Sequence, residues 1–165
     1  MITLKKLKIS QALSRETVAF TADIYFNGKR VGEAYNEGHG GSTMAALHHV
    51  DEFTRARIGG VVKDYFSKKP AAERIPGMET LDEYIDDLVY AEQEKKEAER
   101  LYRKTARTVL FVQGGLLRHL VGKVSLEEAA IDQFKRRNPD ATVINGMPKD
   151  QAIELLLKHV RGQVG

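Results

Sequence analysis

The residues best suited to chemistry lie in one short segment, residues 36–43, which reads Asn-Glu-Gly-His-Gly-Gly-Ser-Thr. A cluster of glycines marks backbone that adopts positive φ or approaches another molecule closely. The segment falls between a predicted strand and a predicted helix, and the free N–H groups of a helix N-terminus bind anions such as phosphate. We therefore predict an anion-binding loop assisted by Arg30; the loop residues are Gly38, His39, Gly40, Gly41, Ser42 and Thr43.

The same segment has a second interpretation as a plain connection between a strand and a helix, with Ser42 as the N-cap. It contains no GxGxxG pattern, and no lysine follows its last glycine as in a P-loop. At the level of sequence both interpretations stay open.

Histidines and acidic residues follow the loop, and they raise the question of a metal or an acid–base pair. His48 and Glu52 stand one helical turn apart, but a zinc-binding HExxH motif, with two histidines at that spacing, is absent. Glu37 and His39 form a pair without an identifiable nucleophile. We therefore favour a non-enzymatic binding protein, and we expect no catalytic residue, no metal and no cofactor.

Charge is distributed unevenly along the chain. Residues 101–165 carry eleven Lys or Arg against six Asp or Glu (+5), whereas residues 36–100 carry nine against fourteen (−5). The basic last third offers an alternative interface for DNA or RNA, although basic residues at helix C-termini also complement the helix dipole. Aromatic residues make up only 7% of the chain, which argues against a base-stacking surface. The candidate residues are Arg103, Lys104, Arg107, Lys135, Arg136 and Arg137.

The amino-terminal part is predicted to form β structure. Residues 18–26 alternate between two faces with a period of two. Asn27 and Gly28 then suit a type I′ turn, so that residues 29–35 form the second arm of a hairpin. Residues 2–9 are predicted as an edge strand, where lysines discourage pairing with other chains.

The middle of the chain is predicted to be helical. Residues 43–66 have apolar positions at three-four spacing, with a kink or break at Gly59 and Gly60. Thr80 and Glu83 form a capping box that opens a second, long helix of about 25 residues. Exposed apolar positions on that helix, Leu81, Leu88 and Tyr102, favour a homodimer.

The last third is predicted to alternate short strands and helices: a strand at 108–112, a further strand within 116–124, a helix from a capping box at 125–128 to Asn138-Pro139, a strand at 141–144 and a last helix from Pro148. The fold class is therefore α+β. An antiparallel hairpin or sheet packs with helices, a long charged helix follows, and a strand-helix-strand-helix unit ends the chain. We predict a single domain over residues 1–165, in three parts: 1–66, 67–107 and 108–165.

Composition limits the class of protein further. The chain has 165 residues, 42% of them hydrophobic, and no cysteine. The absence of cysteine excludes disulfides and thiolate chemistry. No window approaches the roughly 18 apolar residues of a membrane span, and the N-terminus lacks the apolar stretch of a signal peptide. We expect a soluble cytoplasmic protein that does not bind membranes.

The hairpin, the Asn-Glu-Gly-His-Gly-Gly loop and the later Thr-Val-Leu-Phe segment give the chain a resemblance. It resembles small uncharacterised proteins encoded by bacteriophages and prophages, over residues 16–42 and, more loosely, 108–145. The resemblance implies the host cytoplasm, and action on host machinery or host defence by binding a protein or sequestering a nucleotide. We expect a binding protein for a nucleotide or phosphate-bearing ligand. The alternatives are an inhibitor that binds a host protein and the nucleic-acid-binding protein above.

Overall fold

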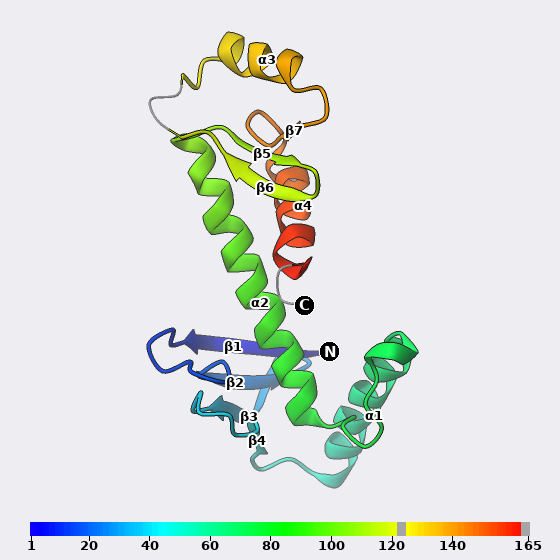
Figure 1. Cartoon of the computed structure of the whole chain (residues 1–165). Coiled ribbons are helices and arrows are strands. Elements are labelled where there is room, and N and C mark those ends of the chain that lie inside the picture. The colour runs from blue at the N-terminus through cyan, green and yellow to red at the C-terminus, as the bar shows by residue number, and fades with distance from the viewer. Residues whose placement is uncertain (122–124, 163–165) are drawn as a thin grey trace. The chain divides into compact units, whose positions relative to one another are not determined.

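The computed structural model describes residues 1–121 and 125–162. The chain divides into two compact units, unit 1 (Met1–Tyr90) and unit 2 (Ala91–Gly165), and helix α2 (Leu81–Arg103) contributes residues to both. Both units combine antiparallel strands with helices, so the α+β class is confirmed (Figure 1). None of the helices in the described ranges is long and apolar enough to span a membrane.

Unit 1 contains a four-stranded antiparallel sheet in the order β1-β2-β3-β4, formed by β1 (Ile2–Ile9), β2 (Phe20–Phe26), β3 (Lys29–Asn36) and β4 (Met44–Leu47). The predicted hairpin is confirmed, because Asn27 and Gly28 have φ of 50° and 82°, as a type I′ turn requires. Strand β1 is an edge strand, as predicted, and its pairing shifts register between Lys5 and Lys8.

The prediction of a helix from residue 43 was wrong for its first nine residues, 43–51. Residues Met44–Leu47 form β4, in which Met44 pairs with Tyr35 of β3 and Leu47 pairs with Gly32. Helix α1 (Glu52–Lys68) begins later, where the Asp51 carboxylate accepts a hydrogen bond of 2.6 Å from the Thr54 N–H. The expected break at its two central glycines is also absent, since α1 continues through them.

One face of the unit 1 sheet packs against helices. Ile24 of β2 and Ile85 of α2 are fully buried, and Ile58, Val62 and Phe66 of α1 join them in one apolar cluster. Between the helices, residues 69–80 include a short 3-10 turn, Ala71–Glu73. The predicted start of α2 is confirmed by the Thr80 hydroxyl, which accepts from the Glu83 N–H at 3.3 Å. The other face of the sheet carries polar and exposed side chains, and it is called the open face below.

Unit 2 is built around a three-stranded sheet in the order β6-β5-β7, formed by β5 (Leu110–Gln113), β6 (Leu116–His119) and β7 (Thr142–Val143). One face, with Val109 and Phe111, packs against Ile131 and Phe134 of α3 (Glu128–Arg137). The other face, with Leu110, packs against the end of α2 and against α4 (Lys149–Gly162). Figure 1 shows the β5-β6 ribbon between these helices.

The remaining predictions for unit 2 met mixed outcomes. A 3-10 turn, Lys104–Ala106, follows α2. The N-cap of α3 is Glu127, and Ser125 accepts only from the Glu127 N–H, so the second capping box was misplaced. Asn138 ends α3 as predicted. Part of the strand predicted within 116–124 is β6; residues 122–124 lie outside the described ranges.

Candidate functional site

The glycine-rich loop joins β3 to β4, two neighbouring antiparallel strands. The sequence prediction placed it before a helix, and that premise was wrong because residues 44–47 extend the sheet. No helix N-terminus therefore follows the loop directly, and the dipole argument for phosphate binding there no longer applies.

Asn36 is buried at the end of β3 and holds the loop together. Its Oδ1 accepts hydrogen bonds from the Gly38 N–H at 2.8 Å and from the Thr17 hydroxyl at 2.9 Å. Its Nδ2 donates to the Gly41 carbonyl at 3.0 Å and to the Thr43 hydroxyl oxygen at 3.2 Å. One amide side chain thus fixes both ends of the loop, so many of the loop's polar groups serve its own structure.

Several predicted ligand residues are engaged or covered. The Gly38 N–H donates to Asn36, and the Gly40 N–H donates to the Thr17 hydroxyl at 3.3 Å. Thr43 is only 1% exposed, and its hydroxyl donates to the Asp86 carboxylate. Gly38 is also buried. Of the predicted loop residues, the exposed ones are His39, Gly40, Gly41 and Ser42.

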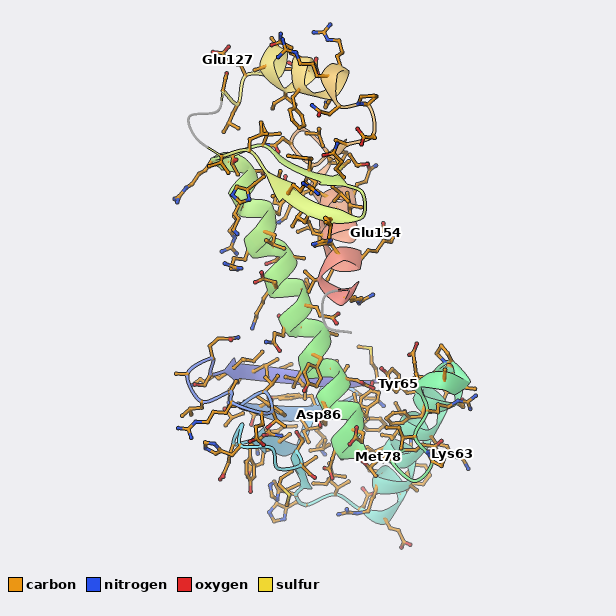
Figure 2. The ribbon with its side chains drawn as sticks, viewed as in Figure 1. Lys63, Tyr65, Met78, Asp86, Glu127 and Glu154 are labelled. Carbon is orange, nitrogen blue, oxygen red and sulfur yellow. The ribbon has the colours of Figure 1, made fainter. Side chains whose placement is uncertain are left out.

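The hydrogen bond between Thr43 and Asp86 ties the loop to α2, and Figure 2 shows Asp86 on the part of that helix that belongs to unit 1. Burial raises the pKa of Asp86, the Thr43 hydrogen bond opposes that effect, and the nearby charge of Asp82 adds to it. The Asp82 carboxylate in turn accepts from the Ala45 N–H at 2.9 Å. These two aspartates anchor the start of β4, which makes their role structural.

Arg30 does not reach the loop. It stands near the start of β3 and Asn36 at the end, which at roughly 3.3 Å per residue leaves about 20 Å of strand between them. Its guanidinium bonds Asp23 at 2.8 Å and Glu33 at 3.4 Å. Asp23 and Glu33 face each other across β2 and β3, so Arg30 neutralises two opposed carboxylates.

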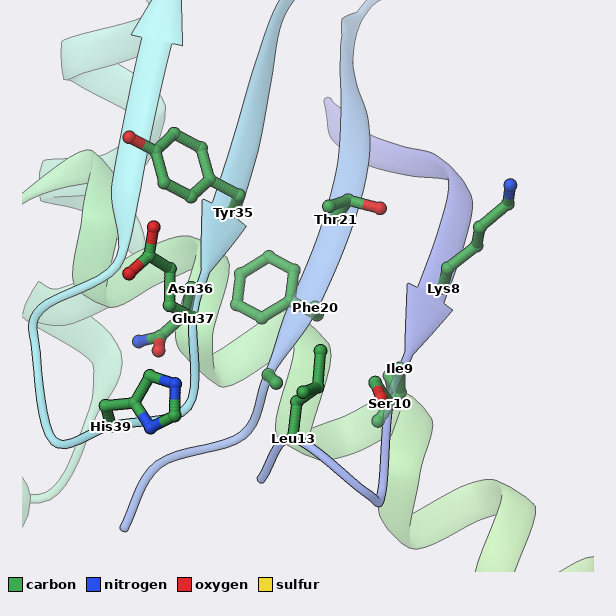
Figure 3. A pocket seen from close by; sticks show the side chains of 11 residues that line it. Lys8, Ile9, Ser10, Leu13, Phe20, Thr21, Tyr35, Asn36, Glu37 and His39 are labelled. Carbon is green, nitrogen blue, oxygen red and sulfur yellow. The ribbon is translucent and has the colours of Figure 1, made fainter. Parts of the chain in front are cut away.

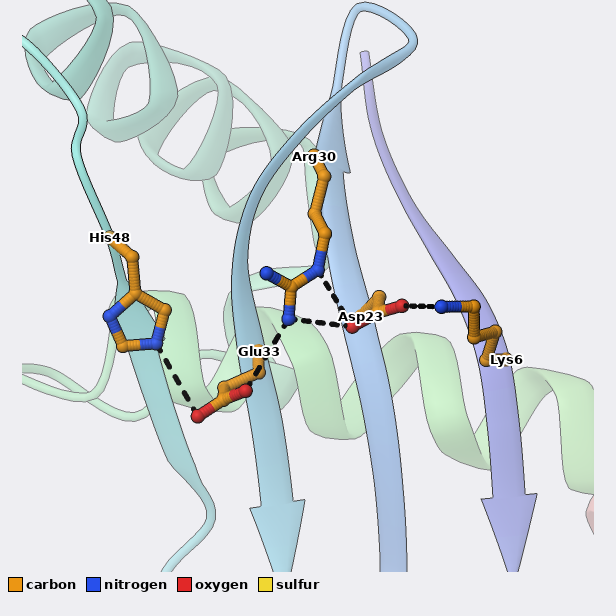
Figure 4. Close-up of polar contacts among 5 residues, drawn as sticks. All are labelled: Lys6, Asp23, Arg30, Glu33 and His48. Carbon is orange, nitrogen blue, oxygen red and sulfur yellow. Dashed lines mark hydrogen bonds and ion pairs between the residues drawn. The ribbon is translucent and has the colours of Figure 1, made fainter.

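These three residues belong to a row of charges that crosses the open face, Lys6, Asp23, Arg30, Glu33 and His48, which we call the charge ladder (Figure 4). Lys6 lies 3.0 Å from Asp23, and His48 lies 3.4 Å from Glu33. Hydrogen bonds from Lys6 and then Arg30 lower the pKa of Asp23. The ladder thus gives both carboxylates, Asp23 and Glu33, basic partners.

Next to the ladder, at the loop end of the sheet, lies a groove of about 470 Å³. We call it the apolar groove; it is lined by Lys8, Ile9, Ser10, Leu13, Ala19, Phe20, Thr21, Tyr35, Asn36, Glu37 and His39 (Figure 3). Leu13 and Tyr35 are its exposed apolar side chains, at 55% and 43%, whereas Phe20 also lines it but is only 3% exposed. Of the predicted site residues the groove includes one, His39.

Two basic side chains line the apolar groove without a salt bridge to any residue in the described ranges: Lys8 and His39. Figure 3 shows the His39 ring turned toward the groove and the Lys8 side chain extending away from the floor. A lysine ammonium is a compact point charge on a flexible four-carbon stem, which lets it reach a nearby anion. Glu37 is the acidic residue of the lining. The groove therefore joins exposed apolar surface to a border with two basic side chains.

A second hollow of about 390 Å³ lies on the open face itself. We call it the face hollow; it is lined by Lys6, Lys8, Thr21, Ala22, Asp23, Glu33, Ala34 and Tyr35. Three residues, Lys8, Thr21 and Tyr35, line both hollows. The two hollows are therefore neighbours that share a border on the sheet.

The basic residues of unit 2 fall at two helix ends. Arg103 ends α2, and Lys104 and Arg107 lie in and just after the 3-10 turn. Lys135, Arg136 and Arg137 form the last turn of α3, where they complement the dipole. Within the described ranges, Arg103 pairs with Glu99 and Lys135 with Asp132, at 3.9 Å and 3.4 Å.

Neither hollow was predicted from the sequence. The alternation that placed Phe20 in a strand predicted its burial, which is observed, but gave no sign that Leu13, which lines the same groove, is 55% exposed. Among the described residues no three potential metal ligands stand close enough to hold an ion.

Comparisons with protein-family models, with curated proteins and with solved structures found no match to this chain.

Proposed function

We propose that unit 1 is a binding module for a small anionic ligand with a flat apolar ring, such as a nucleotide, held in the apolar groove. The observation that supports this is the combination in one groove of two exposed apolar side chains, Leu13 and Tyr35, with the basic side chains of Lys8 and His39. Small-molecule sites typically combine a mostly apolar lining with a few polar groups that fix orientation.

This proposal moves the ligand from the backbone of the glycine-rich loop to the groove beside it. The loop still contributes His39, and Asn36 fixes the backbone on which His39 stands. The ring of the ligand would cover Leu13, and its phosphate would face Lys8 and His39. A volume of about 470 Å³ lies in the range of ordinary ligand pockets.

The experiment is isothermal titration calorimetry of the whole chain with AMP and with adenosine at low salt. AMP is expected to bind at least tenfold more tightly than adenosine, because only AMP carries the phosphate. Lys8→Ala is expected to weaken AMP binding about fivefold, since one exposed charge contact is worth about 1 kcal/mol. Leu13→Ser is expected to weaken AMP and adenosine alike, because it removes apolar floor.

Lys5→Ala is the matched control. Lys5 is an exposed lysine on the same strand, but it lies over the Tyr25 ring and does not line the groove. AMP affinity should therefore be unchanged in Lys5→Ala. Absence of AMP binding, or an equal loss in Lys5→Ala and Lys8→Ala, would contradict the proposed site.

A further inference from the structure

We infer that the ligand of unit 1 has two parts joined by a phosphodiester: an apolar ring in the apolar groove and a second part, rich in hydroxyl or amino donors, in the face hollow. This inference rests on the proposed function and specifies its ligand class. It follows from the shared border of the two hollows, where Lys8, Thr21 and Tyr35 line both.

The shared border determines where the phosphate lies. Lys8 is the cation that lines both hollows, and it has no salt bridge within the described ranges. Thr21 and Tyr35 pair across β2 and β3, but Figure 3 shows the Tyr35 ring turned toward β4 and the Thr21 hydroxyl on the side of Lys8. A phosphodiester at this border meets the Lys8 cation and the Thr21 hydroxyl donor, which are groups that recognise it.

The face hollow has the opposite preference. It contains the carboxylates of Asp23 and Glu33, which repel a phosphate and accept hydrogen bonds from hydroxyl or amino groups. Asp23 is held by Lys6 and Arg30. The Glu33 side chain is 55% exposed and keeps acceptor capacity, although it also contacts Arg30 and His48.

Along the sheet, three kinds of group therefore follow one another: the apolar surface of the apolar groove, the Lys8 cation at the shared border, and the carboxylates of the face hollow. A dinucleotide has the same order: a base, a phosphodiester, then a ribose and a second base with several donors. Carboxylates that accept from ribose hydroxyl groups are a recurrent feature of nucleotide sites. A mononucleotide would occupy the apolar groove and leave the face hollow empty.

The test compares the dinucleotide ApA with AMP by calorimetry on the full chain. ApA is expected to bind about tenfold more tightly than AMP. Glu33→Ala removes both acceptor oxygens and is expected to remove most of this advantage, whereas AMP affinity should be unchanged because Glu33 does not line the apolar groove. Glu79→Ala, at an exposed glutamate outside both hollows, is the matched control and should change neither affinity.

Amide chemical shifts give an independent readout of location. ApA is expected to shift the amides of residues 22–23 and 33–34, at the floor of the face hollow, which AMP leaves unchanged. If AMP binds and ApA binds no more tightly, or shifts no further amides, the two-part ligand is overturned and the proposed function stands. If neither compound binds, the proposed function is overturned and this inference with it.

Discussion

Gly38 is the loop position at which an added side chain disturbs most. Its φ is +84°, a conformation that costs a non-glycine residue about 1–2 kcal/mol. A Cβ there would overlap the Leu13 carbonyl oxygen and would lie 2.8 Å from the Ala19 Cβ. The backbone must shift to relieve these clashes, which adds about 1–3 kcal/mol. Gly38→Ala is therefore expected to destabilise the protein by about 2–5 kcal/mol.

Gly41 is the matched control in the same loop. It has no positive φ, and a Cβ there would have no neighbouring atom within 4 Å. Gly41→Ala restricts the unfolded chain without straining the folded one, so we expect it to be neutral or to stabilise by up to about 1 kcal/mol.

Thermal unfolding followed by far-UV circular dichroism measures both variants. For a folding unit of about 90 residues, 1 kcal/mol corresponds to roughly 4–8 °C in Tm. Gly38→Ala should therefore lower Tm by roughly 8 °C or more, and Gly41→Ala should leave it unchanged or slightly raised. Equal shifts in the two variants would refute the reasoning that Gly38 stands at a strained and crowded position and Gly41 does not.

A half-buried aspartate, a buried asparagine and the basic helix ends give further expected outcomes. Asp86→Asn keeps an oxygen acceptor for Thr43 and removes the charge. Burial raises the pKa of Asp86 in the folded protein, so the protonated carboxyl contributes stability below the ordinary pKa of an aspartate. This contribution is lost as pH rises through the raised pKa. The urea midpoint of Asp86→Asn, relative to that of the wild type, should therefore increase between pH 4 and pH 7. Asn145 is 7% exposed; its Oδ1 accepts from the Leu110 N–H at 2.7 Å, and its Nδ2 donates to two carbonyls. Asn145→Ala leaves these backbone groups without their partner and should destabilise the protein by about 2–4 kcal/mol. The urea midpoint measures this loss. If the basic helix ends of unit 2 bind nucleic acid, their affinity for a single-stranded oligonucleotide, measured by fluorescence anisotropy, should fall steeply with salt. Neutralising about six phosphates corresponds to a loss of roughly 100-fold or more between 50 and 200 mM salt. No binding at the lower salt concentration would exclude this alternative.

The sequence predicted those elements whose period and end signals are local. Alternation across 18–26 and the Asn27-Gly28 turn were sufficient for the hairpin, and Thr80 marked the start of α2. Residues 44–47, Met-Ala-Ala-Leu, favour a helix by intrinsic propensity. They form a strand because β3 offers a partner from Gly32 to Tyr35, and such pairing overrides a weak local preference.

The candidate site depended on contacts that no local pattern encodes. Asn36 looked like an ordinary residue beside a glycine cluster, yet its partner Thr17 lies on a different segment of the chain. Thr43 looked accessible because Asp86, its partner, is 43 positions away. The apolar groove likewise forms where Leu13, Phe20 and Tyr35 meet, and that meeting is decided by strand pairing.

The charge ladder bears on which strand pairing the sheet adopts. Sliding β3 along β2 by two residues would leave every apolar side chain on its own face, so burial alone discriminates poorly between these alternatives. In the observed pairing Arg30 contacts both Asp23 and Glu33, and a slide would separate Asp23 from that shared cation. Each exposed pair is worth at most about 1 kcal/mol. Their joint effect is selective: they disfavour a mispaired hairpin that would otherwise compete with the native one.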